Sequence, residues 1–221
     1  MKPLADIDLV LFDLDGTLVD TAPDLGGAAN QVRADLGLPP LADALYRPVA
    51  SAGARGLLKV ALDLTPDHPE FAVRRDAFLA YYRARLTQRS APFPGIAQML
   101  LAQELRGRRW GVVTNKPSFL TDPLMRELKL YDRAACVISA DHVPAPKPAP
   151  DSLNLALQRT GVAAGRTIYV GDDLRDIEAA QAAGMRSIAA GWGYISPGTP
   201  IEHWGADLIA AAVAELGALL S

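Results

Sequence analysis

Short runs of β-branched and other apolar residues recur along this chain, each separated from the next by a longer stretch of helical character. This alternation is typical of β-α-β units, in which a helix returns the chain so that successive strands run parallel. Several runs are apolar at every position, as expected of central strands covered by helices on both faces. We therefore predict an α/β fold with a Rossmann-like parallel sheet core, its strands at residues 9–12, 110–114, 136–139, 168–171 and 187–190.

The interval 20–93 breaks this alternation, because it contains helical patterns and no predicted strand. Helical periodicity runs through residues 25–36, behind a capping box formed by Thr21 and Asp24. A second amphipathic helix is predicted at 77–86. This much helix exceeds what a single crossover between neighbouring strands needs.

We interpret the interval as an all-helical cap domain inserted into the sheet domain. The cap would span residues 20–93, and the α/β catalytic core would comprise residues 1–19 and 94–221. A segment rich in proline and glycine, APFPG at 91–95, marks the far boundary. The alternative is a single domain decorated with extra helices.

Composition narrows the classes of function. Of the 221 residues, 50% are hydrophobic and 21% are charged, which is typical of a globular protein. The net charge of −3 argues against a partner such as a nucleic acid, whose binding proteins carry a concentrated basic face. The nearest basic cluster, Arg106, Arg108 and Arg109, is interpreted as a solvated helix end.

The single cysteine and the absence of long apolar runs bear on location. Cys136 has no intrachain partner, which fits a reducing compartment, and its apolar neighbours predict a buried thiol. No secretion signal and no membrane-spanning run is recognised in the sequence. We therefore expect a cytoplasmic protein that does not bind membranes, and the sequence implies no protein partner.

Two aspartates follow the first predicted strand directly. Asp13 and Asp15 are separated by one residue, so in extended chain their side chains would face the same side, about 6–7 Å apart. Leu14 would then turn to the core, and Gly16 would allow a sharp turn. Because ligands of open parallel sheets bind beyond the carboxyl ends of the strands, this pair is a candidate site.

Other polar side chains follow three later stretches of the chain, at the same predicted edge of the sheet. A carboxylate, hydroxyl, amide or ammonium group alone has an ordinary explanation as a helix cap, a turn residue or a surface charge. Several of them gathered at the strand ends predict one site. The candidates are Thr114 and Asn115 in VVTNKP, Lys147 in APKPAPD, and Asp172, Asp173 and Asp176 in GDDLRD.

This combination of groups indicates phosphoryl chemistry. Carboxylates from separate strands suit a hard divalent cation, and Mg²⁺ uses one or two carboxylates together with water and substrate phosphate. Hydroxyl, amide and ammonium donors beside the cation would hold the oxygens of a phosphoryl group. One aspartate can attack phosphorus, and a second carboxyl can protonate the leaving oxygen and later activate water. Asp13 and Asp15 are the candidates for these two tasks.

The order of the motifs resembles the haloacid dehalogenase superfamily of phosphatases. The resemblance rests on DLDGTLVD at 13–20, TN at 114–115, KP at 147–148 and GDDLRD at 171–176, and it covers essentially the whole chain. A helical insertion between the first two motifs is similar to the C1-capped branch, which includes the phosphoglycolate phosphatases.

Carried over to this sequence, the resemblance implies specific roles. Asp13 would be the nucleophile and a Mg²⁺ ligand, and Asp15 the acid/base whose backbone carbonyl also ligates the metal. Asp172 would be a further metal ligand. Thr114 and Lys147 would bind the phosphoryl group with the assistance of Asn115, and Asp173 and Asp176 would support the metal and its waters.

Further segments bear on the substrate, a small phosphate ester. WGVVTNKP, GDDLRDIE and HWGAD are similar to a branch acting on N-acetylmuramic acid 6-phosphate in bacterial cell-wall recycling, whose members are often labelled phosphoglycolate phosphatases. Both substrates carry a carboxylate. Arg55, between two glycines in the predicted cap, is a candidate for binding it, the alternative being a solvent-exposed arginine at a helix start. His203 and Trp204 are expected to form a packed surface corner.

Two other functions remain open from the sequence. A sugar phosphomutase of the same superfamily would share all the motifs and differ mainly in its cap. A phospho-accepting receiver module of a signalling system also uses an acidic pair, a threonine and a lysine on a parallel sheet. In receivers, however, the acidic pair precedes the phospho-accepting aspartate, whereas here the order is reversed.

Overall fold

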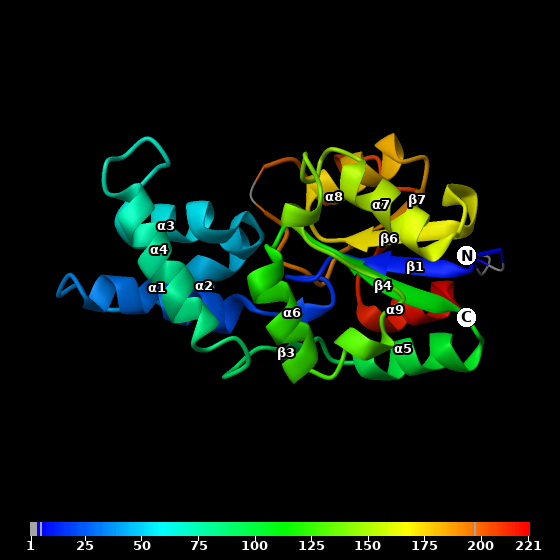
Figure 1. The fold of residues 1–221 in the computed structure, drawn as a ribbon, viewed down its shortest axis with the longest axis horizontal. Coiled ribbons are helices and arrows are strands. Elements are labelled where there is room, and N and C mark those ends of the chain that lie inside the picture. The colour runs from blue at the N-terminus through cyan, green and yellow to red at the C-terminus, as the bar shows by residue number, and fades with distance from the viewer. Residues whose placement is uncertain (1–3, 5, 197) are drawn as a thin grey trace.

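The computed structural model describes residue 4, residues 6–196 and residues 198–221; the predicted core range 1–19 therefore includes residues 1–3 and 5, which lie outside the described residues. Its centre is a sheet in which all neighbouring strands run parallel, in the order β5-β4-β1-β6-β7-β8 (Figure 1). The predicted α/β class is confirmed. The strands are β1 (Leu9–Phe12), β4 (Arg109–Val113), β5 (Val137–Ile138), β6 (Thr167–Gly171), β7 (Arg186–Ala190) and β8 (Leu208–Ala210).

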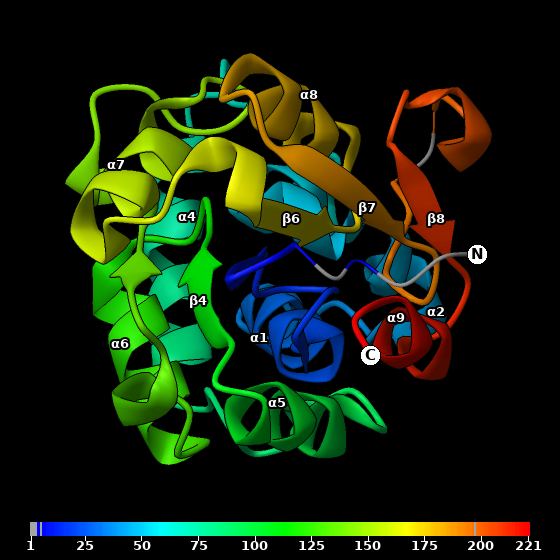
Figure 2. The same cartoon turned by 90° about the vertical axis from the view of Figure 1, so that its right-hand side faces the viewer.

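Helices cover both faces of the sheet, because its central strands are apolar on both sides. In β1, Val10 and Phe12 pack into one apolar cluster while Leu9 and Leu11 pack into another. Figure 2 shows α5 and α9 on one face and α7 and α8 on the other. These helices, with α6 beside β4, are α5 (Ile96–Leu105), α6 (Ser118–Glu127), α7 (Asp151–Thr160), α8 (Leu174–Ala182) and α9 (Val213–Leu219).

Four helices and a 3-10 turn lie in the chain between β1 and α5; we call residues 22–83 the helical insertion. Figure 1 shows them gathered at one end of the molecule, on the side to which β1 points. They pack around α1, which contacts α2, α3 and α4. Their bounds are α1 (Ala22–Ala34), α2 (Asp43–Tyr46), the turn η1 (Arg47–Ala52), α3 (Gly53–Leu62) and α4 (Phe71–Arg83).

The chain enters and leaves the insertion side by side. β2 (Val19–Asp20) and β3 (Ala91–Pro92) pair antiparallel over two residues. The prediction that the interval 20–93 contains no strand is therefore wrong for β3. Two residues are too few to produce a periodic pattern, so only the proximity of the two passages reveals this pairing.

The helix boundaries differ from the predicted ones. Thr21 does not form the predicted capping box, because its hydroxyl donates instead to Asp15. The second predicted helix, 77–86, corresponds to α4, which begins six residues earlier and ends at Arg83. Its buried side chains include Phe71 as well as Phe78 and Tyr82, so the apolar stripe extends further toward the N-terminus than the predicted segment.

Outside the site, two sequence predictions and one missed strand can be compared with the fold. Cys136 is buried, as expected. The strand β8 was not predicted, because its three residues run into an alanine-rich stretch that resembles a helix. The solvated-end interpretation is wrong for Arg108, whose guanidinium donates to the backbone carbonyls of Ile7 and Leu220 and so ties the chain ends to the sheet. Every helix among the described residues is too short or too polar to traverse a bilayer.

Candidate active site

The carboxyl ends of three adjacent strands carry the polar residues. Asp13, Thr114 and Asp172 directly follow β1, β4 and β6, which are neighbours in the sheet. The ladder continues one residue past the strands, since Asp13 N donates to Val170 O and Thr114 N to Ile138 O. Parallel pairing thus brings residues more than 150 positions apart in the chain to one edge.

Three buried carboxylates meet at this edge. One oxygen from each of Asp13, Asp172 and Asp176 lies within 4.8 Å of the others. Burial, with the negative charges of Asp13 and Asp176, raises the pKa of Asp172 well above its ordinary range. Burial also raises the pKa of Asp176 to about 6, although the nearby Lys147 ammonium opposes this shift. The groups therefore share an unfavourable excess of negative charge.

The charge and the donor set of this cluster fit a divalent cation. Lys147 is the ammonium that contacts Asp13 and Asp176, so with all three carboxylates ionised two negative charges would remain uncompensated. Carboxylate oxygens are the ligands that hard cations such as Mg²⁺ prefer. A bound divalent ion would neutralise this excess without protonating a carboxylate.

Two glycines leave room for Asp172. Gly16 has φ +87°, and a Cβ there would lie 2.1 Å from Asp172 Oδ2. At Gly193 a Cβ would lie 2.2 Å from the Asp172 Cβ and 2.7 Å from Gly16 O. Any larger residue at these positions would displace the carboxylate. Three donors fix Asp172, namely Thr17 Oγ1, Ser51 Oγ and Tyr194 N.

Lys147 is placed by the loop that carries it and by its neighbours. Its buried ammonium donates to Asp13 Oδ1 at 2.9 Å and to Asp176 Oδ1 at 2.6 Å. Burial alone would lower the pKa of Lys147, but these two carboxylates outweigh it and raise the pKa above its ordinary value. The Asn115 side chain donates to Lys147 O and accepts from Lys147 N, both at 2.9 Å. Asn115 therefore holds the lysine loop in place.

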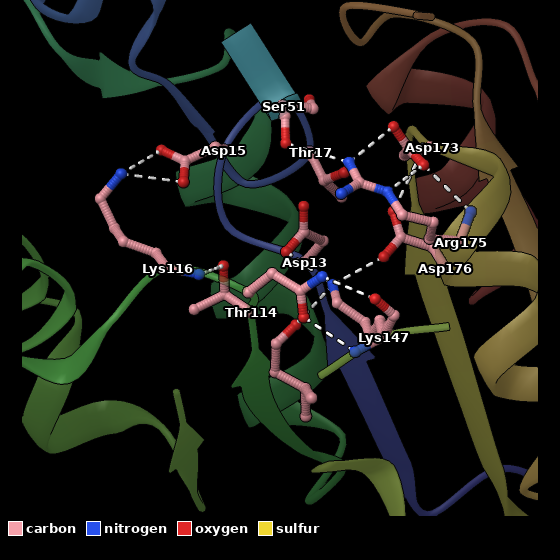
Figure 3. Close-up of polar contacts among 12 residues, drawn as sticks. Asp13, Asp15, Thr17, Ser51, Thr114, Lys116, Lys147, Asp173, Arg175 and Asp176 are labelled. Atoms are coloured by element: carbon pink, nitrogen blue, oxygen red, sulfur yellow. Dashed lines mark hydrogen bonds and ion pairs between the residues drawn. The ribbon is translucent and has the colours of Figure 1, made fainter. Parts of the chain in front are cut away.

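The carboxylate of Asp15 lies apart from that cluster. Its two oxygens accept from Lys116 Nζ at 2.8 and 2.9 Å (Figure 3). Thr21 Oγ1 also donates to this carboxylate. Lys116 is almost fully buried, and its ammonium lies 4.6 Å from the centroid of the Tyr82 ring in α4. Sequence reasoning gave Lys116 no role. The sequence signal that could have identified Lys116 as a site residue is its position two residues after Thr114, in a loop at the edge of the sheet.

The two acidic residues of the last motif have different surroundings. Asp173 caps α8, and its carboxylate binds the guanidinium of Arg175. Asp176 accepts from the Asp173 backbone N–H and points its other oxygen into the carboxylate cluster (Figure 3). Of the pair expected to support a metal, the structure brings Asp176 to the cluster and directs Asp173 away from it.

A cavity of about 480 Å³ opens between the sheet edge and the helical insertion. Asp13, Asp15 and Thr114 line its floor, and apolar side chains of the insertion, Phe71 and Phe78 among them, line its opposite wall. This volume is within the range of roughly 300–1,000 Å³ that is common for small-molecule sites. The site is thus a covered pocket with a charged end and an apolar wall.

The candidate Arg55 lines the same cavity. The other cationic side chains of its lining each pair with an acid, and these pairs are Arg75 with Asp76, Lys116 with Asp15, Lys147 with Asp13 and Asp176, and Arg175 with Asp173. The guanidinium of Arg55 is exposed and has no acidic partner among the residues that the structure describes. An anionic group entering the cavity would therefore find this cation available.

His203 and Trp204 are not among the residues that line the cavity. Trp204 is buried, its indole N–H donating to Thr199 O, and it packs in a small apolar cluster with Ile177 and Ala189. His203 is exposed beside it. Their arrangement is that of a packed surface corner, as expected.

Comparison with known proteins agrees with this geometry. Residues 10–190 match the haloacid dehalogenase-like hydrolase family. N-acetylmuramic acid 6-phosphate phosphatase of Pseudomonas aeruginosa is 43% identical over 200 residues, which are 90% of this chain and 88% of that protein. Phosphoglycolate phosphatase of Xanthomonas campestris pv. campestris is also 43% identical, over 204 residues and 90% of each chain.

Solved structures agree as well. The crystal structure of a predicted phosphoglycolate phosphatase from Haemophilus somnus superposes with a TM-score of 0.86 at 28% identity, covering 99% of this chain and 100% of that one. CbbY from Rhodobacter sphaeroides, in complex with phosphate, gives a TM-score of 0.75 at 27% identity over 96% of both chains. The family match, together with curated phosphatases aligned over nine tenths of the sequence, shows that this chain belongs to the haloacid dehalogenase-like hydrolases and is a phosphatase.

Proposed function

We propose that this phosphatase is a Mg²⁺-dependent phosphomonoester hydrolase that acts through an aspartyl-phosphate on Asp13. The position of Asp13 carries the proposal: its carboxylate borders the cavity, belongs to the carboxylate cluster and contacts the Lys147 ammonium. A carboxylate so placed is accessible to a substrate and is held in one orientation, as a nucleophile needs to be.

Asp13, Asp172 and the backbone carbonyl of Asp15 would hold the metal ion. Asp176, expected from the sequence to support the metal and its waters, is close enough to Asp13 and Asp172 to be a further ligand. When bound, Mg²⁺ would supply positive charge to the phosphoryl oxygens and so offset the repulsion between phosphate and carboxylate. Lys147 and the hydroxyl of Thr114 would bind the remaining phosphoryl oxygens from the other side. Asn115 would contribute by fixing the backbone of Lys147, to which its amide is bonded.

The chemistry would proceed in two transfers. Asp13 attacks phosphorus, the bond from phosphorus to the ester oxygen breaks, and Asp15 gives that oxygen its proton. A water molecule then loses a proton to Asp15 and attacks phosphorus, which releases Asp13 and inorganic phosphate. Asp15 is thus returned to its protonated form. This role is supported by the position of Asp15, which lines the cavity together with Asp13.

We further propose that residues 20–93 act as a cap that selects the leaving group. Relatives at equal identity are named for N-acetylmuramic acid 6-phosphate and for phosphoglycolate. The cavity of about 480 Å³ with its apolar wall favours the larger of these, an acetylated sugar acid, over a two-carbon acid. Arg55 would bind the substrate's carboxylate, since that guanidinium has no acidic partner among the described residues.

Release of inorganic phosphate tests the proposal directly. The purified protein with Mg²⁺ should hydrolyse N-acetylmuramic acid 6-phosphate with a higher kcat/KM than phosphoglycolate, and chelation should abolish both activities. Asp13→Asn should fold normally and lose turnover, because an amide is a poor nucleophile. More than a few per cent of residual activity in Asp13→Asn would refute the aspartyl-phosphate. With a hexose 1-phosphate, formation of an isomer instead of free phosphate would identify a mutase.

A further inference from the structure

Arg175 joins the sheet edge to the helical insertion. Its Nε donates to Asp173 Oδ1 at 2.8 Å and its Nη2 to Asp173 Oδ2 at 2.9 Å, so the two side chains meet as a fork. The same Nη2 donates to the backbone carbonyl of Ser51, at 3.0 Å, in η1. Figure 3 shows the guanidinium lying between Asp173 and Ser51. One side chain thus links positions that are 124 residues apart.

Asp173 is bound in a way that fixes the arginine. Both carboxylate oxygens are engaged by Arg175, and one of them also accepts from Ser196 Oγ at 3.1 Å. A paired, partly buried guanidinium loses little further entropy on donating to a second acceptor. The carboxylate of Asp173 thus holds Arg175 in place.

Ser51 begins the segment that carries Arg55. Its hydroxyl donates to Asp172 at 3.3 Å, so the insertion reaches the carboxylate cluster at this residue. Gly53, two residues on, has φ +58° and ψ −146°, a conformation that only glycine adopts readily. The chain turns there into α3, whose first turn contains Arg55 at the cavity. The position of Ser51 therefore sets where Arg55 lies.

We propose that Arg175, held by Asp173, is a positioning residue that docks Ser51 and thereby places Arg55 for the carboxylate of the substrate. The docking contact is independent of the reaction. The consequence for substrate selection rests on the proposed function of Arg55. Substrates with a carboxylate should depend on Arg175, whereas a phosphate ester without one should not.

Hydrogen–deuterium exchange tests the docking without any substrate. In Arg175→Gln, the amides of residues 51–58 should exchange faster than in the wild type. Arg175→Lys keeps a positive charge beside Asp173 but lacks the second donor of the fork, so it should show the same change to a smaller degree. Arg186→Gln, which removes a surface pair with Asp6, is the matched control and should leave this segment unchanged. Unchanged exchange in Arg175→Gln would overturn the docking.

Kinetics test the consequence. On N-acetylmuramic acid 6-phosphate, Arg175→Gln should raise KM by about 10- to 100-fold, the loss expected for a charged hydrogen bond. For p-nitrophenyl phosphate, kcat/KM should stay within about threefold, because Thr17 Oγ1 and Tyr194 N still hold Asp172 when the weak contact from Ser51 is lost. The double variant with Arg55→Ala should be no worse than Arg55→Ala alone, because both changes remove one interaction. If the increase in KM of the double variant equalled the product of the increases in the two single variants, the positioning role of Arg175 would be overturned. An Arg55→Ala variant without any loss would instead overturn the proposed function of Arg55, so the two failures are distinguishable.

Discussion

At the scale of residues, Asp13 and Asp15 are neighbours with different partners. Asp13 contacts the buried Lys147 within the carboxylate cluster, whereas Asp15 contacts Lys116 and Thr21 beyond it. The fully buried Leu14 between them anchors the turn, and the chain bends at Gly16 with φ +87°. Two carboxylates with separate environments can serve separate chemical tasks.

We expect Asp15→Ala to stop the reaction halfway. The nucleophile remains, and an aryl phosphate with a good leaving group needs no proton, so Asp13 should still be phosphorylated. Hydrolysis should then stall, because no base activates water. Mass spectrometry of the variant after exposure to p-nitrophenyl phosphate should show one added phosphoryl group. The double variant Asp13→Asn/Asp15→Ala should take up none. Sustained turnover by Asp15→Ala would show that Asp15 is not the acid/base.

At the scale of elements, the connection between the insertion and the sheet depends on the first helix. Asp24 is fully buried in the first turn of α1. One of its carboxylate oxygens accepts hydrogen bonds from Arg89 N, Ser90 N and Ser90 Oγ. These two residues belong to the returning passage, as we call residues 84–92, in which the chain leaves the insertion for the sheet. Beside it, the Tyr194 hydroxyl accepts from Thr21 N and Ala22 N. Side chains therefore satisfy backbone groups where the chain passes between the two regions.

Asp24→Ala should lower the free energy of unfolding by about 2–4 kcal/mol, because it leaves two backbone N–H groups without their acceptor. Asp43→Ala is the matched control. Asp43 also binds Arg89, but through an exposed pair, so its loss should cost less than about 1 kcal/mol. Chemical denaturation of both variants provides the comparison. Equal and small losses would mean that Asp24 does not secure the returning passage.

At the scale of the whole molecule, the fold concentrates negative charge where sheet and insertion meet. Asp172 and Asp176 are fully buried, and their pKa values are raised above the ordinary 3.8. The metal-free folded protein therefore retains protons that the unfolded chain has already lost. The stability associated with Asp176 is complete below pH 3.8 and is lost as the pH rises through about 6, its folded pKa. The stability associated with Asp172 is likewise lost as the pH rises through its own raised pKa.

Mg²⁺ should stabilise the protein more at high pH than at low pH. The ion binds the deprotonated carboxylates, so the increase in Tm on adding Mg²⁺ should be larger at about pH 8 than at about pH 5. Asp176→Asn should weaken this dependence on pH. Asp132→Asn, a change at an exposed surface acid, should leave it unaltered. An equal increase in Tm at both pH values would contradict a metal site made of these carboxylates.

Much of this architecture could be predicted from the sequence. Strands buried on both faces produce continuous apolar runs, and the residue that follows each run must lie at the carboxyl edge of a parallel sheet. These local rules located five strands and the positions of Asp13, Thr114 and Asp172 at the ends of their strands. They missed β2 and β3, which have no separate apolar run of their own, and β8, which continues into an alanine-rich stretch that resembles a helix.

Only the tertiary structure decided which side chains meet. Asp173 and Asp176 belong to one motif, yet the start of α8 turns Asp176 into the carboxylate cluster and leaves Asp173 to bind Arg175. Lys116 and Asp15 are 101 residues apart, and Arg175 and Ser51 are 124 apart. Sequence patterns register spacing along the chain, whereas these contacts depend on where packing places separate segments. The sequence by itself thus determined the sheet and its motif positions, and tertiary packing determined the pairings that organise the site.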